Sequence, residues 1–155
     1  MAAQRILLPY NFSQNDNKAL EFITTTFGQH EDIDITVFHA YTPLTEIEDY
    51  DHQSATAKLK RRLSYLTEEL TEREIALQEL RTRLINSGFD RDRVRYIFKS
   101  RKLEIAAAII EQTKEEDYDI IVLNHRPGKV TRFFTGSVFT KVVTALQDIT
   151  VCIVS

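Results

Sequence analysis

The sequence lacks the residues that would mark a disulfide scaffold, a low-complexity chain or a membrane protein. Its 155 residues include a single cysteine, Cys152, which excludes an internal disulfide framework and suits a reducing compartment. With only four glycines and three prolines, no low-complexity tract or flexible linker is visible. No apolar run approaches the ~20 residues that span a bilayer. The first residues lead straight into a predicted strand without a signal-peptide core, so we expect a cytoplasmic protein with no membrane partner.

Charge and length indicate an ordinary globular protein rather than one that binds nucleic acid. The formal net charge is −3, which gives no general attraction for nucleic acid. The chain is 43% hydrophobic and 28% charged, as in ordinary globular proteins. A chain of this length is expected to form one domain with one core, residues 1–155.

Apolar runs alternate with helical stretches along the whole chain. The predicted strands are Arg5–Pro9, Ile33–Tyr41, Arg93–Lys99, Tyr118–Leu123 and Ile149–Val154. The predicted helices are 13–28, Ser54–Ser87, Leu103–Glu115 and Gly136–Leu146. Strands that are apolar on both faces and separated by helices indicate an α/β fold, with an open five-stranded parallel sheet and helices on both faces. Ligands in such sheets bind beyond the carboxyl ends of the strands.

The second helix is unusually long and carries a leucine seam. Its leucines recur in steps of four, three, four, seven, three and four, broken only where Arg73 takes the skipped position: Leu59, Leu63, Leu66, Leu70, Leu77, Leu80 and Leu84. At ~1.5 Å per residue the helix would be ~50 Å long, which is longer than short strands can cover. Either its carboxyl half packs on the sheet and its start is frayed or kinked, or it contacts another helix in a dimer or a partner.

Several segments together carry a family resemblance. The chain opens with "ILLPYNFSQNDNKALEF", continues with "DITVFHAY" and "DYDIIVLNH", and ends with "GSVFTKVVTALQDITVCIV". In order and spacing these segments resemble the universal stress protein family over essentially the whole chain. The resemblance implies a sheet of order 3-2-1-4-5 and a homodimer that pairs through the last strand, here Ile149–Val154, with the Leu59–Leu84 helix as a possible second contact. Many members of this family bind ATP, and others lack the binding signature.

The family's phosphate-binding signature is only partly present. It consists of a glycine, two residues, a second glycine, nine residues, and then Gly-Ser or Gly-Thr, so that backbone N–H groups can reach phosphate oxygens. Gly136 and Ser137 match its end, but Asn124 and Pro127 replace the two earlier glycines, and the loop is one residue short. The aspartate that usually follows the first strand is replaced by Asn11.

The local charge favours an anion nevertheless. Between residues 120 and 147 there is no Asp or Glu, while Arg126, Lys129, Arg132 and Lys141 contribute four positive charges. Arginine can hold phosphate with two parallel hydrogen bonds, which would partly replace the lost backbone contacts. A basic loop exposed to solvent, with no ligand, is the alternative.

The resemblance and the loop together predict a cofactor site for ATP or a related adenine nucleotide. Its residues would be Pro9, Asn11, Ala40, Asn124, Arg126, Gly128, Gly136 and Ser137. The alternative is a dimeric interaction protein of the same family that binds no nucleotide. A third hypothesis is an enzyme of the related adenine-nucleotide α-hydrolase group, but the Ser-Gly-Gly-x-Asp-Ser loop of those enzymes is replaced by "YNFSQND".

No catalytic or metal site is predicted. Ser13 and Ser137 lack a nucleophile elbow, and helix capping explains them better. His39 and His125 fall near the carboxyl edge of the sheet without the further ligands that a metal needs. We therefore expect no enzyme, with any ATP hydrolysis slow and incidental.

Overall fold

The computed structural model describes residues 2–43, 56–125 and 138–155. These residues contain a five-stranded sheet in the order β3-β2-β1-β4-β5, in which every pairing is parallel. The strands are β1 (Gln4–Pro9), β2 (Ile33–Tyr41), β3 (Val94–Ser100), β4 (Ile120–Asn124) and β5 (Thr150–Val154). The predicted fold class and the strand order implied by the family resemblance are confirmed.

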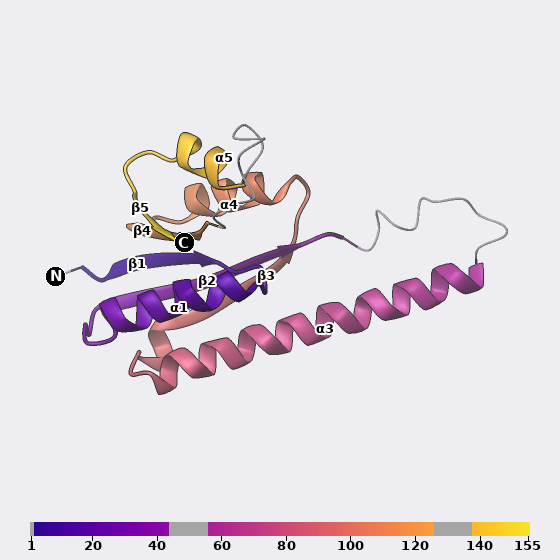
Figure 1. Ribbon diagram of the computed structural model, residues 1–155, viewed down its shortest axis with the longest axis horizontal. Helices are drawn as coiled ribbons and strands as arrows, with labels where there is room; N and C mark the ends of the chain where they lie inside the picture. Colours follow the sequence, from indigo (N-terminus) through magenta and orange to yellow (C-terminus); the bar gives the residue numbers. More distant parts are fainter. Residues whose placement is uncertain (1, 44–55, 126–137) are drawn as a thin grey trace.

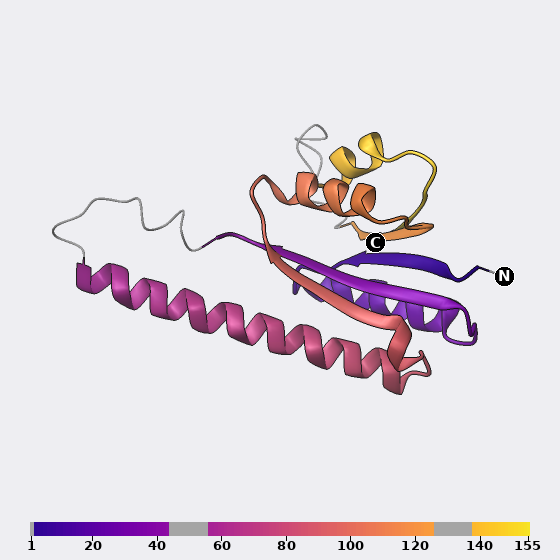
Figure 2. The same ribbon diagram turned by 180° about the vertical axis from the view of Figure 1, so that it is seen from behind.

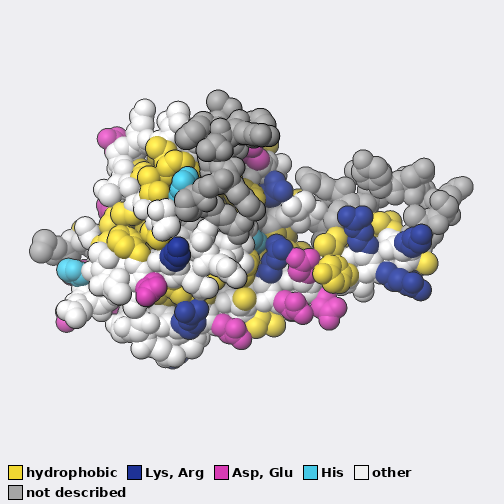
Figure 3. Space-filling model, in the orientation of Figure 1, with side chains coloured by type: hydrophobic (Ala, Val, Ile, Leu, Met, Phe, Trp, Pro, Cys, Tyr) yellow, Lys and Arg dark blue, Asp and Glu magenta, His cyan; other side chains and the backbone are white. Residues whose placement is uncertain are grey.

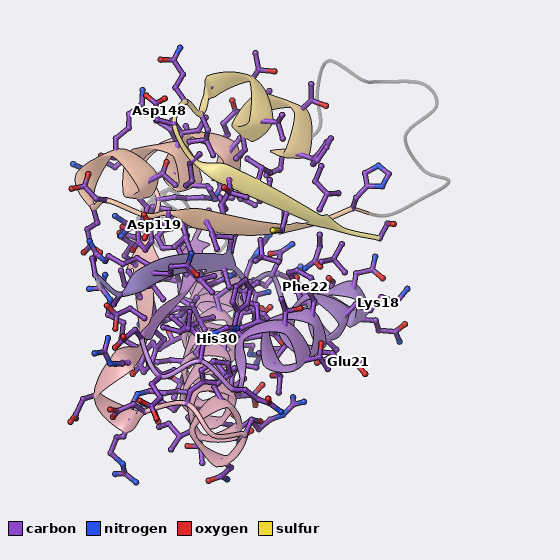
Figure 4. The ribbon with its side chains drawn as sticks, turned by 90° about the vertical axis from the view of Figure 1, so that its left-hand side faces the viewer. Lys18, Glu21, Phe22, His30, Asp119 and Asp148 are labelled. Carbon is purple, nitrogen blue, oxygen red and sulfur yellow. The ribbon has the colours of Figure 1, made fainter. Side chains whose placement is uncertain are left out.

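Helices cover both faces of the sheet (Figures 1 and 2). They are α1 (Gln14–Phe27), α3 (Thr56–Asn86), α4 (Ile105–Glu115) and α5 (Val138–Ala145), with a short 3-10 turn η1 (Arg91–Arg93) before β3. Figure 4 views the sheet from its amino-terminal edge, with α4 and α5 on one face and α1 and α3 on the other. In that view Lys18 and Glu21 point from α1 away from the sheet, as expected of exposed charged residues.

Alternation along the strands builds a core on each face. In β1, Ile6 and Leu8 belong to the core under α1 and α3, whereas Leu7 between them belongs to the core under α4 and α5. Successive side chains of a strand point to opposite faces of the sheet, so one apolar run contributes residues to both cores. The two fully buried residues Ile121 and Val122 divide in the same way in β4.

The helix ends agree with the capping signals. Asp16 accepts a hydrogen bond from the backbone N–H of Ser13 at 2.8 Å, which is one half of a capping box between these two residues. Gly88 follows α3 with φ of 114°, a conformation that glycine adopts without strain, and Phe89 N–H bonds back to the Leu84 carbonyl at 3.3 Å.

The helix α4 starts later than the predicted helix Leu103–Glu115. Leu103 is 65% exposed and lies before Ile105, the first residue of α4. The side chain of Arg101 donates to the Leu103 carbonyl at 2.9 Å, which belongs to the loop rather than to the helix.

The long helix is one continuous element of 31 residues. Its carboxyl half supplies Leu77, Leu80 and Leu84 to the core on the sheet, and its amino half extends beyond the sheet (Figure 1). The helix is unbroken over Thr56–Asn86, and the starting residues of the prediction, 54 and 55, lie outside the described residues. Within the described residues, no helix is both long and apolar enough to cross a bilayer.

Candidate functional site

A cavity of about 380 Å³ opens at the carboxyl edge of the sheet, where β1, β2 and β4 end. Apolar side chains form much of its wall. They come from β2, β4 and the helices of the second face: Phe38, Leu123, Ile105, Ile109 and Val138. The cavity therefore lies at the position where parallel α/β sheets bind ligands.

Four of the eight predicted site residues line this cavity. Pro9, Asn11, Ala40 and Asn124 come from the ends of three different strands and the loop after β1, and the fold brings them together. The other four, Arg126, Gly128, Gly136 and Ser137, lie outside the described residues. What the four described residues bind remains a prediction.

Asp16 holds the polar side of the cavity in place. Its Oδ2 accepts hydrogen bonds from the backbone N–H groups of Asn11 at 2.9 Å and Ser13 at 2.8 Å. Its Oδ1 accepts from the side-chain amide of Asn124, which is 108 residues away in the chain. Asp16 is only 3% exposed, and it joins the loop after β1 to the end of β4.

Asp16 was missed as a site residue by sequence reasoning. Its spacing from Ser13 predicted its part in helix capping, but the contact with Asn124 depends on the pairing of β1 with β4. A carboxylate in the first turn of a helix directly after the ligand-facing end of a strand was the available signal.

Among the described residues, the backbone of Ala40 has no hydrogen bond to the chain that follows β1. β1 ends at Pro9, which is in register with Phe38, and the Phe38 carbonyl accepts the Tyr10 N–H at 2.8 Å. Residues two apart in a strand direct their N–H and C=O groups to the same side. The N–H and C=O of Ala40 are thus directed past the end of β1 toward the cavity, which Ala40 lines.

His39 lies on the opposite face of β2 and packs in an aromatic cluster. Its ring stacks on Phe98 with 5.8 Å between centroids, and Phe12 meets it edge-on at 4.8 Å. Its Nδ1 contacts the Tyr10 carbonyl at 2.7 Å, so Nδ1 carries the hydrogen. Burial lowers the pKa of His39, and its Nε2 is buried without a hydrogen-bond partner among the described residues.

Of the four predicted cations, the structure describes Lys141 alone. Lys141, one of the four predicted cations, forms an exposed ion pair with Glu104 at 2.7 Å. The other three lie outside the described residues. The described parts of the chain contain no group of three or more His, Cys, Asp or Glu that could hold a metal ion.

The model of the universal stress protein family matches residues 2–151. The chain belongs to this family. No curated protein matches its sequence significantly.

Solved structures of family members share the fold. The universal stress protein UspA from Lactobacillus plantarum superposes with a TM-score of 0.69 at 16% identity, covering 100% of this chain and 99% of the other. A universal stress protein from Archaeoglobus fulgidus in complex with dAMP has a TM-score of 0.64 at 16% identity, with both chains covered completely. A universal stress protein in complex with cAMP has a TM-score of 0.64 at 15% identity, covering 100% of this chain and 98% of that one.

One departure from the family pattern has a structural role here. A glycine is common in the family where the third strand ends, and this chain has Ser100, the last residue of β3, and Arg101 there instead. The Arg101 backbone N–H donates to the Tyr41 carbonyl at 2.8 Å, and its guanidinium donates to the Thr42 hydroxyl at 2.9 Å. Arg101 therefore ties the loop after β3 to the end of β2 beside the cavity.

Proposed function

We propose that this universal stress protein is a module that binds an adenine nucleotide, ATP or a related one, in the cavity at the carboxyl edge of the sheet. A volume of about 380 Å³ is within the range of small-ligand pockets. The observation that carries the proposal is that one cavity brings together the backbone of Ala40, the side chains of Asn11 and Asn124, and several apolar side chains.

This arrangement matches the chemistry of a nucleoside. The Watson–Crick edge of adenine presents a donor and an acceptor side by side, as do the C=O and N–H of one strand residue. The flat faces of the base would lie against apolar side chains such as Ile109 and Leu123. The amides of Asn11 and Asn124 would reach ribose hydroxyls, and the buried Oδ1 of Asn124 has no partner among the described residues.

The phosphates would extend toward the amino end of α5. Val138, its first residue, lines the cavity, and the chain just before it contains Arg126, Gly128, Gly136 and Ser137. Arginine and glycine-flanked backbone amides are suited to bind phosphate oxygens. Two family members with this fold were solved with the adenine nucleotides cAMP and dAMP, which supports the same class of ligand.

We propose binding without dedicated catalysis. Besides asparagine amides, the cavity is lined by Tyr10, Ser13, His39 and Asp16. The ring of His39 packs between Phe12 and Phe98, and Asp16 already accepts hydrogen bonds on both of its oxygens. Asp16 is therefore a positioning residue and is poorly placed to act as a general base. Slow hydrolysis of a bound triphosphate would be incidental.

Calorimetry and thermal shift with ATP, ADP, AMP and inorganic phosphate test the proposal. Asn11→Ala keeps the backbone N–H that bonds Asp16 but removes an exposed amide from the cavity, so binding should weaken about tenfold. Asn17→Ala is the matched control, because Asn17 is exposed on α1 and does not line this cavity. Ala40→Leu should abolish binding by filling the slot, with circular dichroism checking that the variant is folded.

No response of the wild type at millimolar nucleotide would overturn the proposal. It would favour the second candidate, a dimeric interaction protein that binds no nucleotide. The supporting observation is the edge strand β5, which pairs only with β4 within the described sheet and has Ile153 50% exposed. An Ile153→Arg variant with a halved mass in light scattering would support pairing through β5.

A further inference from the structure

The amino half of α3 continues the leucine seam beyond the core. Leu59, Leu63, Leu66 and Leu70 follow one another in steps of four, three and four, in the same heptad frame as the buried Leu77. All four are half-buried, yet neither core cluster of the described residues includes any of them. An apolar stripe repeated at heptad spacing is the contact surface of a helix that packs on a second helix.

The exposed part of the leucine seam ends at Leu70, where α3 reaches the part of the domain that contains the sheet. Arg73 takes the next seam position after Leu70, and its guanidinium lies 5.8 Å from the centre of the Phe12 ring. It also forms an ion pair with Glu69 at 2.5 Å. The leucine segment available to another helix therefore spans residues 59–70, or ~18 Å at ~1.5 Å per residue.

Charge is strongly separated along this segment. Residues 58–62 contain four cations, Lys58, Lys60, Arg61 and Arg62, and no acidic residue. Residues 68–74 contain four carboxylates, Glu68, Glu69, Glu72 and Glu74, with Arg73 as their one cation. In Figure 3 the basic side chains lie toward the free end of the helix and the acidic ones nearer the body. The helix surface therefore carries positive charge at residues 58–62 and negative charge at residues 68–74, separated by about two helical turns.

We propose that this segment pairs antiparallel with the same segment of a second copy of the chain. A two-fold axis between residues 64 and 65 would place Leu59 opposite Leu70 of the partner subunit and Leu63 opposite Leu66 of the partner subunit. By symmetry all four layers of the contact are leucine on leucine. A surface that fits itself through a two-fold axis is the signature of a dimer rather than of an unrelated partner.

The same alignment makes the charges complementary. Arg62 and Glu69 each directly precede a seam leucine, and these flanking positions face each other in an antiparallel pair, so Arg62 comes within reach of Glu69 of the partner subunit. Lys60 and Arg61 come level with the acidic residues 68 and 69 of the partner subunit and add a longer-range attraction. A parallel pair in register would instead place four cations beside four cations and acids beside acids. Like charges at facing positions of a helix pair oppose that orientation, so the charge pattern selects the antiparallel one.

The geometry leaves room for both domains. In the antiparallel pair the free end of each helix reaches the level of Arg73 in the other subunit, so the two bodies lie at opposite ends. The contact is short, below the size of standard stable interfaces, and we expect a dissociation constant of the order of 10 μM. It is separate from the edge of β5, on which no part of this inference depends.

Sedimentation velocity of the full chain from 1 to 500 μM tests the proposal. Leu66→Glu should weaken self-association at least about 100-fold, because the symmetric contact would then bury two charges against leucine. Its matched control is Ile75→Glu, on the same helix but 48% exposed and outside the seam. Because neither residue belongs to a core cluster, both variants should keep the wild-type helical signal and melting temperature within about 2 °C.

A charge-reversal pair tests the orientation through the single variants, because in a parallel pair like charges already lie side by side in the wild type and neither variant would associate more weakly. A Lys60→Glu/Arg61→Glu/Arg62→Glu variant and a Glu68→Lys/Glu69→Lys variant should each associate about tenfold or more weakly than wild type. Mixed in equal amounts, the two variants should form a heterodimer over the same range of protein concentration in which the wild type associates. A wild type that stays monomeric at 500 μM, or association unaffected by Leu66→Glu, would overturn the proposal. Two charge variants that do not recover on mixing would exclude the antiparallel orientation.

Discussion

The carboxylate of Asp16 is expected to contribute a large share of the stability of the cavity, and its replacement gives a sharp test. Both backbone N–H groups that it accepts, from Asn11 and Ser13, belong to the loop after β1, and their bonds are 2.9 and 2.8 Å long. Hydrogen bonds to a charged group contribute about 1.5–3 kcal/mol each, and neutral ones about 0.5–1.5 kcal/mol. Asp16→Asn keeps the shape of the side chain but removes the charge.

The expected cost of Asp16→Asn follows from these contacts. An asparagine oxygen can still accept both N–H groups, and its NH₂ can donate to Asn124 Oδ1 if the Asn124 amide turns over, because that oxygen has no present partner among the described residues. The loss is then about 1 kcal/mol for each of two charge-assisted bonds, and a further ~0.5 kcal/mol for the interaction with the amino end of α1. We expect a total of about 2–3 kcal/mol.

Asp16→Ala should cost more, about 3–5 kcal/mol, since it leaves two partly buried N–H groups and the amide of Asn124 without an acceptor. For a domain of this length, 2–3 kcal/mol corresponds to a fall in melting temperature of roughly 4–12 °C. Urea unfolding followed by circular dichroism measures both variants on one scale.

Asp119→Asn is the matched control. Asp119 is exposed, and its Oδ2 accepts one backbone N–H, from Arg5, at 2.8 Å. We expect this change to cost less than about 1 kcal/mol because water can replace the lost contact. If Asp16→Asn were no more destabilising than Asp119→Asn, the assignment of Asp16 as the residue that fixes the cavity would be refuted.

Three further predictions concern the core and the response to acid. Leu77→Ala, at a fully buried seam position, should destabilise the chain by about 2–5 kcal/mol, whereas Leu63→Ala outside the core should cost less than about 1 kcal/mol in dilute solution, as urea unfolding would show. The side chain of Arg95 bonds Glu116 and lowers the pKa of that carboxyl below its ordinary 4.5, so its stabilisation is complete above pH 4.5 and is lost as the pH falls through the folded-state pKa. Glu116→Gln should flatten the acid limb of the stability profile by about 1 kcal/mol or less, and an unchanged limb would contradict the contact. Burial lowers the pKa of His39 below 6.5, so the neutral ring favours the folded state above pH 6.5 and that contribution is lost as the pH falls through the folded-state pKa. His39→Gln should remove the slope of the stability profile just below pH 6.5, and a slope that persists would assign it to another group.

The order of elements was predictable because each strand needs apolar residues on both faces. The runs at 6–8 and 120–123 contain apolar residues only, and a sheet covered on both sides is the structure that accommodates them. The positions of Gly88 and of the Ser13–Asp16 capping pair were equally local signals. Such features depend on a few neighbouring residues, which a single sequence displays in full.

Contacts between residues that are far apart in the sequence were harder to predict. Nothing near Asp16 in the sequence indicates that Asn124 will lie beside it, and the Nδ1 contact of His39 with the Tyr10 carbonyl depends on the turn at Phe12, where φ is 59°. The resemblance to a family supplied the strand order, which placed Pro9, Ala40 and Asn124 at one edge. Sequence periodicity alone would have left that order open.

The cavity and the projecting seam have a common structural origin at the carboxyl edge of the sheet. β1 stops at Pro9 while its neighbour β2 continues to Tyr41, and this difference in length exposes the backbone at Ala40. The helix α3 runs antiparallel to the strands, so its overhanging amino half lies at that same edge (Figure 2). Because β2 extends past the end of β1, polar backbone groups at Ala40 are left unpaired among the described residues, and because α3 extends past the sheet, a leucine stripe is left outside the core. We expect each of these two surfaces to bind a ligand or a partner. Because the residues that form the two surfaces are distinct, the effects of Asn11→Ala on nucleotide binding and of Leu66→Glu on self-association should be additive unless binding at one surface changes the other.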